Sequence, residues 1–186
     1  MIRTIILGYL KYQPMTGYDL KQNLDHSISH FWHAHHSQIY TTLRKMEEEG
    51  LVTSEIIPQN GSPDRRVYTI TPAGRKEVED WLNQPMTTAS TIKEEFLVRI
   101  FFSAERDPQE VIAELILQRK LHEEKLHVYL QLQEHLQNKI QKEFPQLARD
   151  VTFWLSTLRM GMRFEKMYME WLDETLNEIQ RLNEQK

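Results

Sequence analysis

The chain has 186 residues, a formal net charge of −4 and a pI of about 6.1. This acidic balance excludes a protein that coats nucleic acid indiscriminately, so any DNA-binding surface must be local. The absence of cysteine excludes disulfides and thiolate metal sites, and it favours a reducing cytoplasm. No apolar run approaches the roughly 18 residues of a membrane-spanning helix, so we expect a cytoplasmic protein with no membrane partner.

Two helices are predicted at the start of the chain. The first carries an apolar stripe from Ile2 to Leu10 and closes before Pro14. The second opens at Thr16, and Asp19 follows at the spacing of a capping box, with Asp in place of the usual Glu or Gln.

A third helix is predicted with Ser37 as its N-cap and Gly50 as its stop. Ile39, Leu43 and Met46 recur at i, i+4 and i+7, so this stripe faces a core. The stretch thus predicts an amphipathic helix of about three turns.

The opposite face of this third helix is polar and cationic. Short polar groups and basic side chains of this kind suit the phosphates and base edges of a major groove. We predict DNA contacts from Ser37, Gln38, Tyr40, Thr41, Thr42, Arg44 and Lys45. The glutamates at residues 47–49 oppose a phosphate backbone, so we expect the N-terminal half of the helix to enter the groove.

A β-hairpin is predicted directly after this helix. Residues 51–57 and 66–71 are β-prone, and Pro, Asn, Gly and Ser between them form turns. Arg65 and Arg66 lie near the hairpin tip, where guanidinium groups meet phosphate or the negative potential of a minor groove. The alternative is that the pair only keeps the loop soluble.

A fourth helix completes the N-terminal domain. It begins at Thr71 as N-cap with Pro72 in the first turn and runs to about Gln84. Three helices, a hairpin and a further helix, in this order, predict a winged helix-turn-helix over residues 1–84, which points to DNA binding.

The chain resembles the PadR family of transcriptional regulators in TGYDLKQNL, FWHAHHSQIYTTLRKMEEEGLV and RRVYTITPAGRKEVEDWL. It is similar to the longer branch of that family, the phenolic-acid-responsive repressors, in KEEFLVRIFF and MYMEWLDETL. The resemblance implies a homodimeric repressor with an N-terminal winged-helix domain and a C-terminal helical dimerisation domain. It places Ser37, Gln38, Tyr40, Thr41 and Lys45 on the recognition helix and Arg65 and Arg66 on the wing. Many relatives have Pro or a larger polar residue at Thr41-Thr42, which leaves the operator sequence open.

The second half of the chain is predicted to be entirely helical. A composition shift at residues 85–91 predicts a linker, followed by a domain over residues 92–186. Its helices are expected to end near Ser103, to run from Asp107 to about Glu143, and to run from about Pro145 to Gln185.

The two long helices of this domain are too long for one protomer to bury their apolar stripes, which predicts a two-fold dimer. Such a dimer places two recognition helices about 34 Å apart, one turn of B-DNA. The predicted interface residues are Leu155, Leu158, Met162, Tyr168, Trp171 and Leu172. The fold class is therefore mainly α with a small β-hairpin.

The resemblance also implies an effector, a small aromatic acid such as a hydroxycinnamate, which lowers DNA affinity. Aromatic side chains are candidates to line its site, although such residues also occur as ordinary core or surface residues. These are Phe31, Trp32, Phe153 and Trp154, together with Tyr168 and Trp171. The candidates to meet the carboxylate are His36, Arg159 and Arg163.

The sequence offers no catalytic constellation. It lacks a phosphate-binding Gly loop, a nucleophile elbow and an HExxH helix, so we expect no enzyme. His26 and His30 stand at a metal-binding spacing, but no carboxylate or Cys accompanies them at fixed spacing, so we expect no metal or cofactor. Two alternatives stay open: a helical adaptor whose winged-helix domain binds protein, and a multidrug-responsive regulator with another effector.

Overall fold

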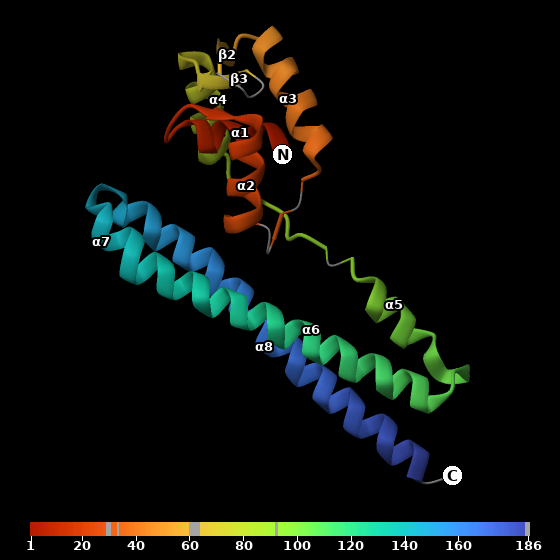
Figure 1. Cartoon of the computed structure of the whole chain (residues 1–186). Helices are drawn as coiled ribbons and strands as arrows, with labels where there is room; N and C mark the ends of the chain where they lie inside the picture. Colours follow the sequence, from red (N-terminus) through yellow and green to blue (C-terminus); the bar gives the residue numbers. More distant parts are fainter. Residues whose placement is uncertain (29–30, 33, 60–63, 92, 185–186) are drawn as a thin grey trace. The chain divides into compact units, whose positions relative to one another are not determined.

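The structure is a computed structural model, and it describes residues 1–28, 31, 32, 34–59, 64–91 and 93–184. The chain divides into two compact units, Met1–Ser90 and Thr91–Lys186. Figure 1 labels their elements. The described residues are mainly helical with a small antiparallel sheet, so the predicted fold class is confirmed. None of the described helices is both long and apolar enough to cross a membrane.

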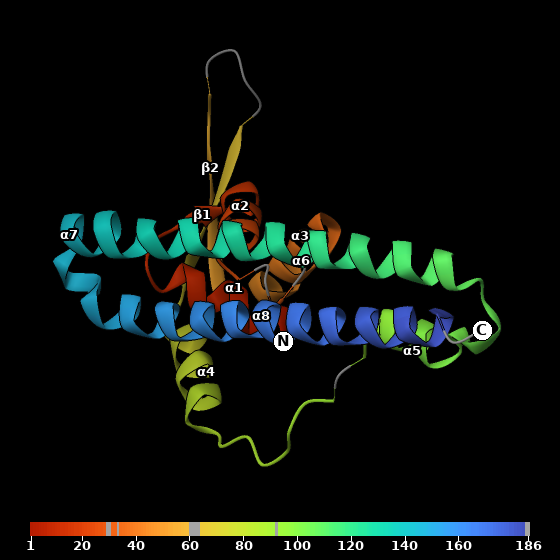
Figure 2. The ribbon, with the colours of Figure 1, turned by 90° about the horizontal axis from the view of Figure 1, so that it is seen from below.

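The first unit has the element order of a winged helix-turn-helix. Its elements are α1 (Ile2–Leu10), β1 (Met15–Thr16), α2 (Gly17–Ser27), α3 (His36–Glu48), β2 (Val52–Ile57), β3 (Arg65–Ile70) and α4 (Pro72–Asn83). Figure 2 shows β2 and β3 as a ribbon that extends beyond the helices of this unit. We call β2, β3 and their connection the wing.

Local hydrogen bonds explain where the helices begin. The Thr16 hydroxyl accepts from the Asp19 N–H at 3.1 Å, and the Asp19 carboxylate accepts from the Thr16 N–H at 3.0 Å, so the predicted capping box is confirmed. Thr71 caps α4 by accepting from the Gly74 N–H at 3.2 Å, also as predicted.

The start of α3 differs from the prediction. Its N-cap is His35 and not Ser37, because the Gln38 side-chain oxygen accepts from the His35 N–H at 3.1 Å and completes the first turn earlier. The end is as expected: Gly50 follows the helix with a φ of +71°, a left-handed conformation that favours glycine.

The sheet contains one strand more than the predicted hairpin. Its order is β1-β3-β2, with Val52 opposite Ile70 in the hairpin and Met15 opposite Tyr68 on the other edge. The pattern could not reveal β1, because two residues are too few to show alternation. The inner face of the sheet joins α1, α2 and α3 in one core, in which Ile6, Leu20, Ile39 and Leu43 are fully buried.

The second unit is built on two long helices. Its elements are α5 (Glu95–Phe101), η1 (Ser103–Glu105), α6 (Pro108–His135), the π-helical turn η2 (Leu136–Ile140), α7 (Gln141–Glu143), η3 (Pro145–Leu147) and α8 (Ala148–Glu184). Asp107 caps α6 as predicted, because its carboxylate accepts from the Gln109 N–H at 2.9 Å. Figures 1 and 2 both show α6 and α8 side by side.

The apolar stripe of α8 is largely covered within one chain, which differs from the expectation that a second protomer covers it. The antiparallel pairing of α6 and α8 supplies the covering surface. Of the residues predicted at a dimer interface, Trp171 is half-buried and the others are buried in the single chain: Leu155, Leu158, Met162, Tyr168 and Leu172. These residues are therefore largely covered within one chain, and their place at a dimer interface stays a prediction.

Candidate nucleic-acid interface

Most of the residues predicted to contact DNA lie on one element, the helix α3. Ile39, Leu43 and Met46 are fully buried, so the opposite side of the helix faces outward. The exposed residues there are Ser37, Gln38, Tyr40, Thr41, Arg44 and Lys45, whereas Thr42 is half-buried. The structure thus brings the predicted recognition residues to one surface, with Thr42 at its margin.

The positive charge of this face comes from Arg44 and Lys45. Within the described part of the chain neither forms an ion pair, and both are exposed. The acids at the C-terminal end of α3 differ, because Glu47 pairs with Arg66 and Glu49 pairs with Arg3. The two cations of α3 are therefore available for phosphate, whereas two of the three glutamates are already matched by a positive charge.

Tyr40 is held at the N-terminal half of α3 by two neighbours. Its ring stacks on the His36 imidazole, with centroids 5.1 Å apart and an interplanar angle of 25°. A Cβ at Gly17 would lie 2.6 Å from the Tyr40 ring, so any larger residue at position 17 would displace this ring from its place beside α2. The sequence pattern did not signal this contact between the two helices of the helix-turn-helix.

The two arginines of the wing lie in β3 itself, at its outer end. Because they are consecutive strand residues, they point to opposite faces of the sheet, and not together into one groove. Arg65 donates to the Asp19 carboxylate of α2 at 3.3 Å. Arg66 donates to Glu47 of α3 and, from its Nε, to the Ser54 hydroxyl at 2.8 Å. Each side chain nevertheless stays about half exposed, at 49% and 50%.

The carboxylate of Asp19 is a charged anchor at this surface. Burial alone raises its pKa, but the hydrogen bonds from Thr16 and the charge of Arg65 outweigh burial, so the pKa of Asp19 lies below its ordinary value. Asp19 thus serves both the α2 capping box and the wing. The first role is predictable from the sequence and the second is not, because the ion pair joins residues that are far apart in the chain.

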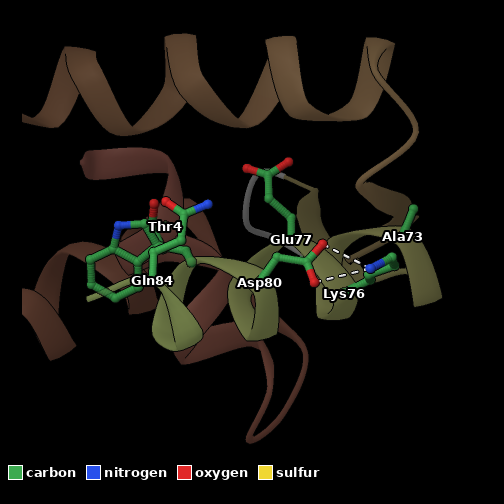
Figure 3. Close-up of a pocket in the computed structure, with 7 residues that line it drawn as sticks. Thr4, Ala73, Lys76, Glu77, Asp80 and Gln84 are labelled. Carbon is green, nitrogen blue, oxygen red and sulfur yellow. Dashed lines mark hydrogen bonds and ion pairs between the residues drawn. The ribbon is translucent and has the colours of Figure 1, made fainter. Parts of the chain in front are cut away.

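An open groove of about 500 Å³ lies on another surface of this unit. Figure 3 shows it between α1 and α4, lined by Thr4, Ala73, Lys76, Glu77, Asp80, Trp81 and Gln84. Lys76 donates to the two carboxylate oxygens of Asp80 at 2.8 Å and 3.0 Å. The two carboxylate oxygens of Glu77 accept from the Arg3 guanidinium at 2.6 Å and 2.7 Å. The groove therefore presents carboxylates and an already paired lysine, which do not suit an anionic ligand.

The predicted effector residues fall in both units. In the first unit, Phe31 and His36 are exposed, and Trp32 packs against the core with its indole N–H buried and without a hydrogen-bond partner. In the second unit all six lie on α8: Phe153, Arg159 and Arg163 are exposed, Trp154 and Trp171 are half-buried, and Tyr168 is buried. The candidates of the first unit and those of the second unit are described separately, so the prediction that they form one effector site stays a prediction.

No metal centre is evident in the described residues, which contain no group of three or more His, Asp or Glu that could hold an ion. Of the two histidines at metal-binding spacing, His30 lies outside the described residues. The second unit contains an unpredicted polar pair, because His122 of α6 contacts Glu165 of α8 and both are buried.

Comparison with known proteins gives matches over both units. Residues 6–80 match the transcriptional regulator PadR-like family, and residues 92–180 match the C-terminal region of virulence activator alpha. The negative transcriptional regulator PadR of Bacillus subtilis (strain 168) is 33% identical over 102 residues, which are 55% of this chain and 56% of that protein. The matched segment thus spans about half the length of that relative.

Two solved structures extend the similarity to nearly the whole chain. The crystal structure of Bacillus subtilis PadR in complex with operator DNA has a TM-score of 0.82 and 28% identity, covering 96% of this chain and 97% of that chain. The structure of Bacillus subtilis PadR in complex with p-coumaric acid has a TM-score of 0.72 and 26% identity, covering 96% and 95%. These relatives are regulators, in agreement with the prediction that the protein is not an enzyme. The first unit of the chain therefore carries, over residues 6–80, a domain of the transcriptional regulator PadR-like family.

Proposed function

We propose that the protein is a homodimeric repressor that binds double-stranded operator DNA through α3 and the wing. The observation that carries the proposal is the outer face of α3, where Arg44 and Lys45 are exposed and, among the described residues, form no ion pair. Cations of this kind meet phosphates, and the polar side chains beside them suit base edges. The similarity to a PadR structure with operator DNA supports this use of the fold.

The proposed dimer uses an apolar stripe on α8 that the single chain leaves exposed. Phe153, Met160 and Met167 recur every seven residues and are 62%, 66% and 50% exposed. Side chains seven apart share one helix face, so the three form a continuous strip that α6 does not cover. A second copy that covers this strip gives the two-fold arrangement that a palindromic operator requires.

The proposed effector is a small aromatic acid that releases the repressor from its operator. The support is the similarity to a PadR structure with p-coumaric acid, together with exposed aromatic and cationic residues on α8. Phe153, Arg159 and Arg163 supply the chemistry that such a ligand needs, an apolar ring contact and guanidinium donors for a carboxylate. Release requires that the acid bind the DNA-free state more tightly than the DNA-bound state.

The test is a fluorescence anisotropy titration with the duplex from upstream of the protein's own gene and an unrelated duplex of equal length. Selective binding to the upstream duplex that weakens with salt is expected, with release on addition of p-coumarate. Equal binding to both duplexes contradicts operator recognition. Selective binding that is indifferent to p-coumarate retains DNA recognition and excludes this acid as effector. Absence of binding to either duplex supports the helical adaptor.

A further inference from the structure

Three side chains from three elements form a closed hydrogen-bonded triangle between the wing and the C-terminal end of α3. The Ser54 hydroxyl of β2 donates to the Glu47 carboxylate of α3 at 2.6 Å and accepts from the Arg66 Nε of β3 at 2.8 Å. Arg66 closes the triangle by donating from Nη2 to the other oxygen of Glu47. We call Glu47, Ser54 and Arg66 the wing clamp.

The register of the sheet explains why these residues meet. Ser54 lies opposite Tyr68, and Arg66 is two residues from Tyr68 in β3, so all three side chains project from the same face of the ribbon. This face carries the buried Val52 and Ile70 nearer the core. The Arg66 guanidinium lies 5.4 Å from the centroid of the Tyr68 ring, which gives it a second support.

The wing clamp uses only part of the donor capacity of Arg66. A guanidinium has five N–H groups, and the contacts with Ser54 and Glu47 occupy two of them, which leaves three. The Arg66 side chain is also more exposed than that of Glu47, at 50% against 27%. The clamp thus fixes the direction of the guanidinium while its remaining donors stay accessible to a phosphate.

We propose that Glu47 is a positioning residue that fixes Arg66 and the wing relative to the recognition helix. The inference rests on the proposed function, because it concerns the geometry of the same DNA-binding surface. A second ion pair, between Arg65 and Asp19, connects the opposite face of β3 to α2. The wing is therefore connected to both helices of the helix-turn-helix, to α2 by Arg65 and to α3 by Arg66.

A positioning role of Glu47 predicts different effects of its loss on selective and on unselective DNA binding. A carboxylate beside DNA repels phosphate, so its loss favours binding to any duplex by charge alone. Loss of a positioning residue instead weakens only the complex in which wing and helix must both fit. We therefore expect Glu47→Ala to weaken binding to the upstream duplex without weakening binding to the unrelated duplex, a result that a purely electrostatic role of Glu47 does not produce.

The experiment measures binding of the full-length Glu47→Ala variant to the upstream and unrelated duplexes. We expect its affinity for the upstream duplex to fall about 10-fold, which is within the range of coupled side chains, with unchanged or tighter binding to the unrelated duplex. Glu48→Ala is the matched control, because Glu48 is exposed on the same turn and lies outside the clamp. It removes the same charge and should weaken neither complex.

Two further variants test whether Glu47 acts through Arg66. Glu47→Gln keeps one oxygen that accepts from Arg66, and its amide N–H can donate to the Ser54 hydroxyl, so its affinity for the upstream duplex should stay within about 3-fold of wild type. Arg66→Ala should weaken binding, and adding Glu47→Ala to it should cost no further affinity. Ser54→Ala opens the same triangle and supplies the test if Glu47→Ala fails to fold.

The proposal is overturned if Glu47→Ala binds the upstream duplex as tightly as Glu48→Ala, or if its loss of affinity adds fully to that of Arg66→Ala. Either result can be distinguished from failure of the proposed function. If the proposed function itself fails, the wild-type protein does not bind the upstream duplex more tightly than the unrelated duplex.

Discussion

At the scale of single residues, Gly17 and Tyr40 illustrate how the helix-turn-helix depends on one close approach. The ring of Tyr40 occupies the space that a Cβ at Gly17 would take, at 2.6 Å. Tyr40 is 42% exposed, so its ring can move outward at low cost to the core. The same movement displaces a side chain of the proposed DNA surface. Function is therefore more sensitive than stability at this position.

Gly17→Ala tests this difference. We expect the free energy of unfolding to change by no more than about 1 kcal/mol, because the gain in helix propensity offsets the displaced ring. Affinity for the upstream duplex should fall several-fold in anisotropy titrations. Gly8→Ala is the control, because a Cβ there meets no atom within 4 Å, and it should leave DNA binding unchanged. Equal DNA affinities of the two variants would show that the position of Tyr40 does not matter.

At the scale of the elements, α6 and α8 are joined by a buried polar cluster. His122 and Glu165 are 7% and 4% exposed, and the His122 ring stacks on Tyr168 with centroids 4.0 Å apart. Burial first, and then the charges of nearby glutamates including Glu165, raise the pKa of Tyr168 and of Tyr129 to about 12. A cluster of this kind fixes the pairing of the helices only while every polar group has a partner.

Glu165→Ala should therefore destabilise the protein strongly, by roughly 3 kcal/mol, because it leaves His122 buried without its partner. Chemical denaturation monitored by circular dichroism measures this change. The matched control is Glu123→Ala, which removes an exposed carboxylate beside His122 on α6 and should have a much smaller effect. A loss of stability no larger than that of Glu123→Ala would argue against a structural role for the buried pair.

At the level of the elements, the sequence predicts local features such as helix caps but not contacts between residues that are far apart in the chain. Caps such as Thr16 with Asp19 depend on residues three positions apart, so local pattern predicts them correctly. The wing clamp joins residues 7 and 19 positions apart, and no local pattern encodes that meeting. The apolar stripe of α8 was recognised, but periodicity alone does not show whether α6 or a second chain covers it. The outer face of α3 was predictable, because its apolar stripe fixes which side faces out.

At the scale of the whole molecule, the proposed dimer depends on the exposed α8 strip and not on the buried stripe. Met160 is at the middle of that strip and is 66% exposed. A charge buried there without a partner is costly, so Met160→Glu should shift the protein from dimer to monomer. Sedimentation velocity measures the mass directly. Met86→Glu is the control, because Met86 is exposed outside the helical unit, and it should leave the dimer intact. An intact Met160→Glu dimer would place the interface elsewhere.

The central claim is that the outer face of α3 binds DNA. The most direct measurement is the salt dependence of upstream-duplex affinity for Arg44→Ala/Lys45→Ala, compared with Arg75→Ala/Lys76→Ala on α4, which removes the same charge from another exposed surface. The α3 variant should lose most of the affinity, and the slope of log affinity against log salt should fall by about 2 per protomer. The α4 variant should retain both. Equal losses in the two variants, or no loss in the α3 variant, would contradict DNA recognition by α3.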